Sequence, residues 1–547
     1  MIASSWRRWA PWLLFGMAVM HLVMVWLLRD PAMINPDSAQ LVTAARNMLD
    51  GNGFATSALY YEQQHRLGDP PVPLTNWPPG FALTMLPFVA IGLTGPDAAF
   101  LVSAIGMAVA VVLTYVVGAA VGLRTSYALL TGGAMALLAH FGLLVVKSMS
   151  EPLFVAATLA SALFLLRAEA SRRPVSVLAM AGALAACAFL TRYAGLAWIA
   201  AGLAMILAMH WRAGWRPVLA RFAAFGILPA VVLGALFARN LLTVGSLTGG
   251  PALGGDTSLR AVLQSDYWAA LRVFGAFNSA GEPVVALLLG CLAAFGGYRT
   301  ATIAVGRRMV DARTSPPHTM DHFVVLATAY TSFTLLLLGY LSFTVYPGFA
   351  EQRYLVPVVP FGLLLGAVLL QGREGSGGPP RPSVRSTRLL FFAAIVAVYV
   401  LGQVRVATHD WAARMTHPQL ALMKDVWRES VAGETVAAYL KRRVTLRAPL
   451  LADDGQVLAA LLGIPTVGLP ERRFSRKVWN EQDVEELMRA LRSCLLLVHP
   501  ASLGPPKGDW PVFLGQLAKG AQPEWLDAIV RSPRLHLYRA RWCEETR

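Results

Sequence analysis

Residues 177–210 read VLAMAGALAACAFLTRYAGLAWIAAGLAMILAMH, an almost continuous apolar run that only Thr191-Arg192-Tyr193 interrupts. One helix of this length would be about 51 Å long, whereas the hydrocarbon core of a bilayer is about 30 Å thick. Two spanning helices that turn near Arg192 account for the run better than one. The stretch therefore predicts a polytopic α-helical membrane protein.

The composition of the whole chain agrees with this class. Of the 547 residues, 56% are hydrophobic and only 14% are charged, and the mean hydropathy is +0.53. Soluble domains usually contain about 25% charged residues, so a soluble globular protein is excluded. Four cysteines exclude a disulfide-built scaffold, and the scattered Gly and Pro residues exclude a fibrous or disordered chain.

The apolar runs predict about eleven spans. They lie at 11–28, 98–121, 127–146, 152–167, 177–190, 193–210, 222–242, 272–298, 322–345, 354–371 and 389–408. A further run, 77–94, begins with Trp77-Pro78-Pro79-Gly80 and contains Pro87, which suits a short helix on the membrane surface.

The positions of the charges indicate whether 77–94 crosses the membrane and how the chain is oriented in it. The net charge of +16 comes mainly from short loops between apolar runs, which is typical of membrane orientation and not of nucleic-acid binding. If 77–94 lies on the surface, the basic clusters at 172–173, 212–221, 299–313 and 373–388 all fall inside, and the acidic loop 29–97 falls outside. We therefore expect a cytoplasmic N-terminus and an extracytoplasmic C-terminus in the plasma membrane, the inner membrane of bacteria.

Two parts of the chain are predicted, 1–408 as the transmembrane part and 409–547 as a small extracytoplasmic α/β domain. In the second part, strands expected at 450–452, 465–469, 495–499 and 535–538 alternate with helices at 456–462 and 484–492. Residues 373–388, rich in Gly, Ser and Pro, are expected to be a cytoplasmic linker.

Two acidic residues are candidates for chemistry on the outer face. Asp37 follows Asn35-Pro36 at the start of a helix expected over 38–50, and Glu151 lies in the short loop 147–151. Either carboxylate has a structural alternative: Asp37 as the N-cap of its helix, and Glu151 as a negative charge in a first helical turn. A carboxylate held at the membrane surface can also act as a general base.

Basic residues from separate outer segments are expected to reach the same face. They are Arg353, Arg192, Arg239 and Lys147. A single arginine at a span end is usually an anchor, and a lone lysine usually snorkels. Several guanidinium groups together match the oxygens of a phosphate, so we predict an anion site centred on Arg353.

Aromatic residues near these charges are candidates for contacting a substrate, because aromatic rings stack on sugars as well as forming interfacial belts. They are Tyr60, Tyr61, His65, Trp77, Tyr193 and Tyr354. No metal-ligand spacing is present. Cys494 and Cys543 both lie in the tail and could pair.

The set of motifs resembles the GT-C superfamily of polyprenyl-phosphate-sugar-dependent glycosyltransferases, which includes protein O-mannosyltransferases and lipid A aminoarabinose transferases. The features that carry the resemblance are Asp37-Ser38, Asn52-Gly53-Phe54, Trp77-Pro78-Pro79-Gly80-Phe81, Ser150-Glu151-Pro152-Leu153-Phe154, Leu190-Thr191-Arg192-Tyr193, Arg239-Asn240 and Arg353-Tyr354. They cover about residues 1–410, and the tail looks like the small outer domain that many such enzymes carry.

The resemblance implies that Asp37 is the catalytic base and that two helices of the first outer loop, here 38–50 and 77–94, lie parallel to the surface. It also implies a sugar donor linked to a polyprenyl phosphate and transfer with inversion. Glu151 stands where some members have Asp. Members that need a divalent metal have more acidic residues near the site, so a metal is not supported here and no other cofactor is predicted.

The sequence thus predicts a glycosyltransferase in which Arg353, helped by Arg192, Arg239 or Lys147, holds the donor phosphate while Asp37 deprotonates an acceptor hydroxyl. The acceptor is a lipid, a glycan or a protein, and membrane lipids surround the chain. Three alternatives remain. The first is a lipid-linked glycan ligase or polymerase, and the second is a secondary transporter, although transporters usually have mid-span charges and repeated halves. A non-catalytic membrane partner protein is the third.

Overall fold

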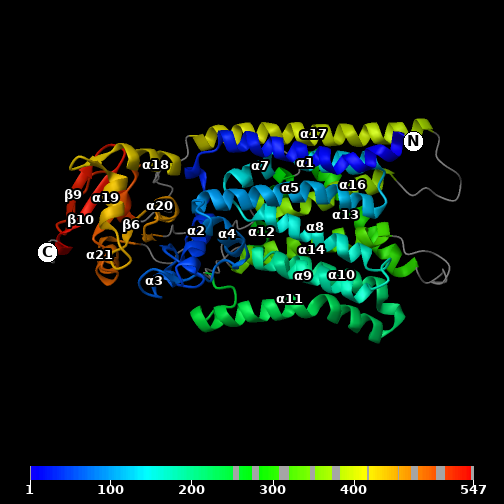
Figure 1. The fold of residues 1–547 in the computed structure, drawn as a ribbon, viewed down its shortest axis with the longest axis horizontal. Helices are drawn as coiled ribbons and strands as arrows, with labels where there is room; N and C mark the ends of the chain where they lie inside the picture. The colour runs from blue at the N-terminus through cyan, green and yellow to red at the C-terminus, as the bar shows by residue number, and fades with distance from the viewer. Residues whose placement is uncertain are drawn as a thin grey trace.

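The computed structural model describes residues 2–250, 258–273, 282–306, 319–344, 352–371, 382–415, 418–453, 455–469, 479–500 and 512–543. A bundle of long helices forms one end of the molecule and a mixed sheet with flanking helices forms the other (Figure 1). The short helices of the first outer loop lie between them, and the N-terminus is at the bundle end, far from the C-terminus.

Eight of the described helices are long and apolar enough to cross a membrane. The elements that contain them are α1 (Ile2–Leu28), α5 (Gly95–Val121), α9 (Pro174–Thr191), α10 (Gly195–His210) with η2 (Trp211–Ala213), α11 (Trp215–Val244), α14 (Thr319–Thr344), α15 (Gln352–Leu355) with η3 (Val356–Val358) and α16 (Val359–Gln371), and α17 (Pro382–Met415). The pair α6 (Thr125–Ala136) and α7 (Ala139–Val146), bent by 41°, would be a ninth span. The predicted count of about eleven stays a prediction.

The run that predicted the fold is divided as expected. Helix α9 ends at Thr191 and α10 begins at Gly195, so Arg192, Tyr193 and Ala194 form the turn between them. The surface helix expected over 77–94 is α4 (Gly80–Ala90), whose 11 residues are too few to cross a bilayer. A Cβ on Gly80 would lie 2.6 Å from the carbonyl oxygen of Leu190, so only glycine lets α4 start this close to the end of α9.

Three expected segments differ in extent from the structure. The run 272–298 begins at the end of α12 (Leu259–Val273) and ends inside α13 (Glu282–Gly306), and its residues 274–281 lie outside the described residues. Helix α17 continues to Met415 because good helix formers follow position 408, so the boundary at 409 lies inside a helix. It also begins at Pro382, within the expected linker, whose residues 373–381 lie outside the described residues.

The sheet has six described strands in the order β2-β7-β6-β8-β10-β9. Strands β6 (Leu450–Ala452), β7 (Thr466–Gly468), β8 (Leu495–Val498) and β10 (His536–Ala540) coincide with the predicted strands, and β9 (Leu526–Arg531) was not predicted. Strands β2, β7, β6 and β8 are parallel, while β10 is antiparallel to β8 and β9. Helices α20 (Gly455–Leu462) and α21 (Glu481–Ala490) correspond to the two predicted helices.

The edge strand β2 (Ala58–Leu59) comes from the first outer loop, which the sequence did not indicate. Helix α2 (Pro36–Leu49) of that loop also packs on α20 of the tail, where Arg46 Nη1 lies 3.5 Å from the carbonyl oxygen of Ala459. One apolar core includes buried side chains of both segments, such as Leu41 and Leu458. The first loop and the tail are therefore parts of one packed unit.

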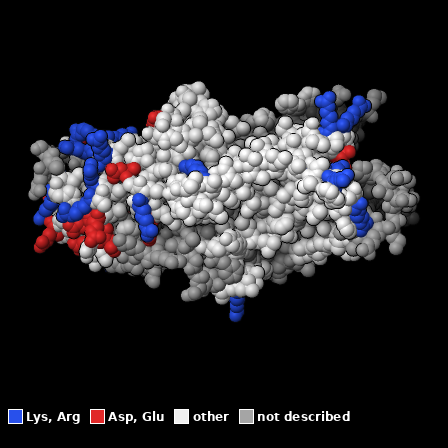
Figure 2. Space-filling model, turned by 90° about the horizontal axis from the view of Figure 1, so that it is seen from below, with Lys and Arg blue, Asp and Glu red and all other residues white. Residues whose placement is uncertain are grey.

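A disulfide joins Cys494, just before β8, to Cys543, just after β10, so the two cysteines that could pair do pair. In the face drawn in Figure 2, the middle of the described surface carries few charged side chains. Lys and Arg gather at both ends, and Asp and Glu lie mainly at the end that holds the sheet. This distribution fits an apolar belt between two polar ends.

Candidate functional site

Asp37 lies in the first turn of α2, and its carboxylate is not the cap of that helix. The N-cap is Asn35, whose side-chain oxygen accepts the backbone N–H of Asp37 at 2.9 Å, and Pro36 occupies the first helical position. The simple capping alternative for Asp37 is therefore wrong. Its carboxylate is left to interact with another segment.

That segment is the start of α15, which lies much later in the sequence. Nη1 of Arg353 donates to Oδ2 of Asp37 at 2.7 Å, across 316 residues of chain. The side chains are 15% and 21% exposed. Nη2 of Arg353 donates to the hydroxyl of Tyr354 at 3.0 Å, and its guanidinium lies 4.9 Å from the centre of that ring. The structure thus brings the predicted base and the predicted phosphate ligand together.

Glu151 and Arg192 form a second acid–arginine pair. Nη1 of Arg192 lies 3.0 Å from Oε1 of Glu151, whose side chain is fully buried at the first residue of α8 (Glu151–Arg167). The same nitrogen donates to the hydroxyl of Ser150 at 3.0 Å. A buried ion pair of this kind costs several kcal/mol to break, because it leaves one charge without compensation.

The ring of Tyr354 connects the two pairs. The guanidinium carbon of Arg192 lies 5.5 Å from its centre, and that of Arg353 lies 4.9 Å away. Both guanidinium groups thus lie within cation–π distance of the same ring. Asp37, Arg353, Tyr354, Arg192 and Glu151 therefore form one cluster, which we call the acid–arginine cluster.

Arg239 belongs to a different group. Its Nη1 and Nη2 donate to the carbonyl oxygens of Leu74 at 2.9 Å and Phe54 at 3.1 Å, both in the first outer loop. Its guanidinium lies 5.3 Å from the centre of the Phe54 ring. In this structure the guanidinium holds the loop backbone against the end of α11.

Tyr193 reinforces the same attachment. Its hydroxyl donates to the carbonyl oxygen of Thr75 at 3.0 Å and accepts the side-chain amide of Asn240 at 2.9 Å. Burial raises the pKa of Tyr193 to about 12, so the hydroxyl stays protonated and remains a donor at neutral pH. Asn240 and Thr75 were not among the predicted site residues, and Asn240 was visible only as the neighbour of Arg239.

The remaining predicted residues are not among the five residues of the acid–arginine cluster. Lys147 follows α7, and its carbonyl oxygen accepts the backbone N–H of Asn35 at 3.1 Å, which ties the start of α2 to that span. The indole of Trp77 donates to Oε1 of Gln40 at 3.3 Å. The rings of Tyr60 and Tyr61 contact each other edge to face, and His65 contacts Trp479 in the same way, beside the sheet.

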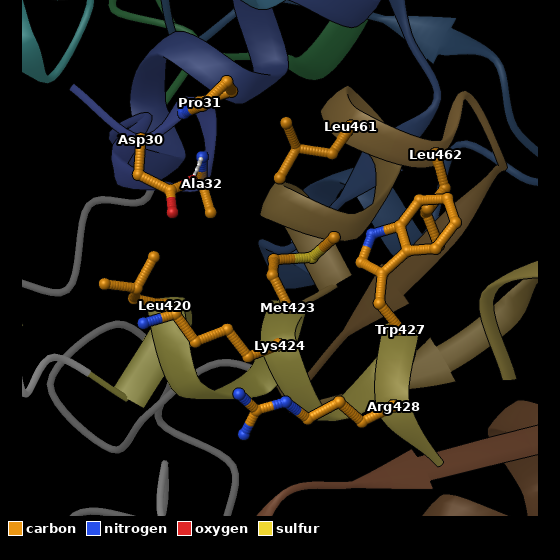
Figure 3. A pocket seen from close by; sticks show the side chains of 10 residues that line it. All are labelled: Asp30, Pro31, Ala32, Leu420, Met423, Lys424, Trp427, Arg428, Leu461 and Leu462. Carbon is orange, nitrogen blue, oxygen red and sulfur yellow. Dashed lines mark hydrogen bonds between the residues drawn. The ribbon is translucent and has the colours of Figure 1, made fainter. Parts of the chain in front are cut away.

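A cavity of about 410 Å³ lies apart from the acid–arginine cluster, between the start of the first outer loop, α18 (Pro418–Arg428) and α20 (Figure 3). Its apolar lining comes from Leu420, Met423, Leu461 and Leu462, and Lys424, Trp427 and Arg428 line it on the α18 side. It contains none of the predicted site residues. Within the described part of the chain, no group of three or more His, Cys, Asp or Glu side chains is placed to hold a metal ion.

Comparison with solved structures identifies the fold. The chain is similar to ArnT from Cupriavidus metallidurans bound to undecaprenyl phosphate, with a TM-score of 0.55 and 14% identity over 96% of this chain and 97% of that one. The apo state of the same protein gives a TM-score of 0.51 with 15% identity and 98% coverage of both chains.

The chain is also similar to the oligosaccharyltransferase of Archaeoglobus fulgidus tethered to an acceptor peptide. The TM-score is 0.50, with 12% identity over 93% of this chain and 72% of that one. No protein-family model matches the chain, and no curated protein is similar to it in sequence. The likeness extends over almost the whole chain, so this chain shares the fold of these solved structures, which agrees with the resemblance seen in the sequence motifs.

Proposed function

We propose that this protein is a membrane glycosyltransferase that moves a sugar from a polyprenyl-phosphate donor to an acceptor hydroxyl on the extracytoplasmic face. The observation that carries the proposal is the contact between Asp37 and Arg353, a carboxylate and a guanidinium from distant segments at one end of the bundle. The solved neighbour ArnT binds undecaprenyl phosphate, which supports a lipid phosphate as the donor class.

In the proposed reaction, Arg353 binds the donor phosphate, assisted by Arg192 and Lys147. Asp37 accepts the proton of the acceptor hydroxyl while that oxygen forms a bond to the anomeric carbon of the sugar. The bond from the anomeric carbon to the phosphate oxygen breaks, and the polyprenyl phosphate leaves with the extra negative charge, which the guanidinium groups stabilise. A single displacement of this kind inverts the anomeric configuration.

Glu151 acts as a positioning residue in this scheme. It is fully buried and contacts Arg192, so it fixes the guanidinium that faces Tyr354. Arg239 and Tyr193 hold the first outer loop in place through the carbonyl oxygens of Phe54, Leu74 and Thr75. Tyr60, Tyr61, His65 and Trp77 remain candidates for contacting the acceptor, since all four lie in that loop.

The orientation we propose places the acid–arginine cluster outside the cytoplasm. Helix α8, with 17 residues, and helix α13, with 25 residues, can be added to the nine possible spans. This gives eleven crossings, with the two termini on opposite sides of the membrane. The basic clusters at 172–173 and 212–221 then lie inside. Reporter fusions near residues 125 and 430 test this, because we expect a cytoplasmic signal from the first and an extracytoplasmic signal from the second.

The decisive experiment compares the glycolipids, polysaccharides and glycoproteins of cells with and without the chain by mass spectrometry. We expect one sugar increment to be missing, and its mass and carrier identify donor and acceptor. Restoring the increment with the wild type but not with Asp37→Asn supports the assigned base. Full restoration by a normally inserted Asp37→Asn variant contradicts it.

The likeness to an oligosaccharyltransferase keeps a lipid-linked glycan ligase as the second candidate. A ligase would transfer a long glycan, so the missing mass would be a series of repeating units and not one residue. The same mass comparison therefore separates the two functions.

A further inference from the structure

If the proposed function holds, Arg353 interacts with two anions, the donor phosphate and the carboxylate of Asp37. It binds the donor phosphate in the reaction, and in this structure its Nη1 already donates to the carboxylate of Asp37 at 2.7 Å. The donor phosphate and the Asp37 carboxylate therefore compete for the same edge of the guanidinium. The outcome of this competition determines the order in which the donor binds and the acceptor is activated.

In this structure Oδ2 of Asp37 accepts the hydrogen bond from Nη1 of Arg353. While it does so, this oxygen is occupied by its guanidinium partner and is not available to the hydroxyl of an acceptor. The phosphate of a lipid-linked sugar donor is a diester with one negative charge, and its two non-bridging oxygens match the guanidinium fork as the carboxylate oxygens do. We propose that the donor phosphate displaces Asp37 from Arg353, so that Asp37 becomes a competent base only when the donor is bound.

The surrounding contacts allow this exchange without rebuilding the site. Arg353 is held independently of Asp37, since Nη2 donates to the Tyr354 hydroxyl at 3.0 Å and the guanidinium lies over the Tyr354 ring. Asp37 is equally independent of Arg353, because Asn35 and not Asp37 caps α2. Breaking the pair leaves both backbones anchored.

The second pair of the cluster shows the contrast. Glu151 is fully buried and Arg192 is 9% exposed, whereas Asp37 and Arg353 are 21% and 15% exposed. An ion pair with access to solvent can exchange partners without leaving a bare charge in an apolar environment. The pair of Glu151 and Arg192 is therefore the fixed one, and the pair of Asp37 and Arg353 is the exchangeable one.

The consequence is an ordered reaction in which the donor binds before the acceptor is activated. Without the donor, Asp37 stays paired with Arg353, the residue that binds the donor phosphate. The inference rests on the proposed function, because it assigns the phosphate to Arg353, but it concerns binding and can be measured without turnover.

The test measures the affinity of the full-length protein, in lipid nanodiscs, for undecaprenyl phosphate. If Asp37 competes with the phosphate, Asp37→Asn binds this lipid about tenfold more tightly, since one charge-assisted hydrogen bond no longer has to be broken. Asp30→Asn is the matched control: its carboxylate accepts the N–H of Ala32 and lines the separate cavity, so we expect no change. Weaker or unchanged binding by Asp37→Asn overturns the exchange, because it means that Asp37 orients Arg353 for the phosphate or does not affect it.

A second measurement uses the wild-type chain and remains informative if the variant fails to insert. Labelling of Asp37 by an apolar carbodiimide, read by peptide mass spectrometry, should rise when undecaprenyl phosphate is added, because the carboxyl group loses its guanidinium partner. Constant or reduced labelling overturns the exchange. The assignment of Asp37 as base fails separately, if Asp37→Asn still transfers sugar, so the two failures are distinguishable.

Discussion

The guanidinium of Arg192 lies against the ring of Tyr354, 5.5 Å from its centre, although the two residues are far apart in the sequence. Arg353 lies over the same ring. Tyr354 therefore contacts one member of each pair, the buried pair of Glu151 and Arg192 and the partly exposed pair of Asp37 and Arg353. Changes at this one side chain should affect both.

Tyr354→Phe keeps the ring and removes the hydroxyl that accepts from Nη2 of Arg353. We expect transfer activity to fall about five- to tenfold, which corresponds to the loss of roughly 1 kcal/mol from one hydrogen bond. Tyr354→Ala should lose more, because both cation–π contacts disappear. Tyr340→Phe, at a largely exposed tyrosine of α14, is the matched control and should keep full activity in the same transfer assay.

Glu151→Ala leaves the buried Arg192 without its anionic partner. We expect a loss of about 3–5 kcal/mol in the free energy of unfolding, measured by thermal or denaturant unfolding in detergent. Glu485→Ala removes an acid from an exposed pair with Arg489 and should cost about 0.5 kcal/mol or less. Equal effects of the two variants would show that the Glu151 pair is not buried.

Arg239→Ala removes two charge-assisted hydrogen bonds to the first outer loop. The free energy needed to open the loop should fall by about 2–3 kcal/mol, since hydrogen bonds to a charged group are the stronger kind. Hydrogen exchange of residues 54–76 should accelerate while exchange in α5 stays unchanged. If activity falls with no change in loop exchange, Arg239 contacts the donor instead.

Acidification should weaken the sheet region through His499. Burial lowers the pKa of its imidazole below the ordinary value of 6.5, although the hydrogen bond with Asp425 acts in the opposite direction. At acidic pH the unfolded chain binds a proton at His499 more readily than the folded chain does. The free energy of unfolding therefore decreases as the pH falls through about 6.5 and below. His499→Gln should unfold with a smaller difference between pH 7.5 and pH 5.5 than the wild type does, and an equal difference would exclude His499 as the source.

Much of the fold follows from the sequence because its signals are local. The break at Arg192-Tyr193 in an apolar run divides α9 from α10, and the strands at 450–452 and 495–498 are short runs of leucine and other apolar residues. The meeting of Asp37 and Arg353 was expected, because both residues were predicted to belong to segments on the outer face. Their roles remain predictions.

The rest depends on contacts that no local pattern encodes. Strand β2 contains only Ala58 and Leu59, and its pairing with β7 accompanies the packing of α2 on α20. Arg239 was grouped with the other arginines, but the carbonyl oxygens that it binds became available only through the path of the loop from Phe54 to Leu74. A side chain's charge predicts the kind of partner and not which partner is near.

The pairing of Ala58 with Thr466 joins residues about 400 positions apart, which is a very high sequence separation for two hydrogen-bonded strands. In the orientation that we propose, the first outer loop is exported early in synthesis, before its neighbour in the sheet has been translated. Strand β2 of the loop therefore lacks its partner strand β7 until the last part of the chain has been synthesised. Chains truncated before position 466 should for this reason be recognised by proteolytic quality control, even though their hydrophobic helices are already inserted.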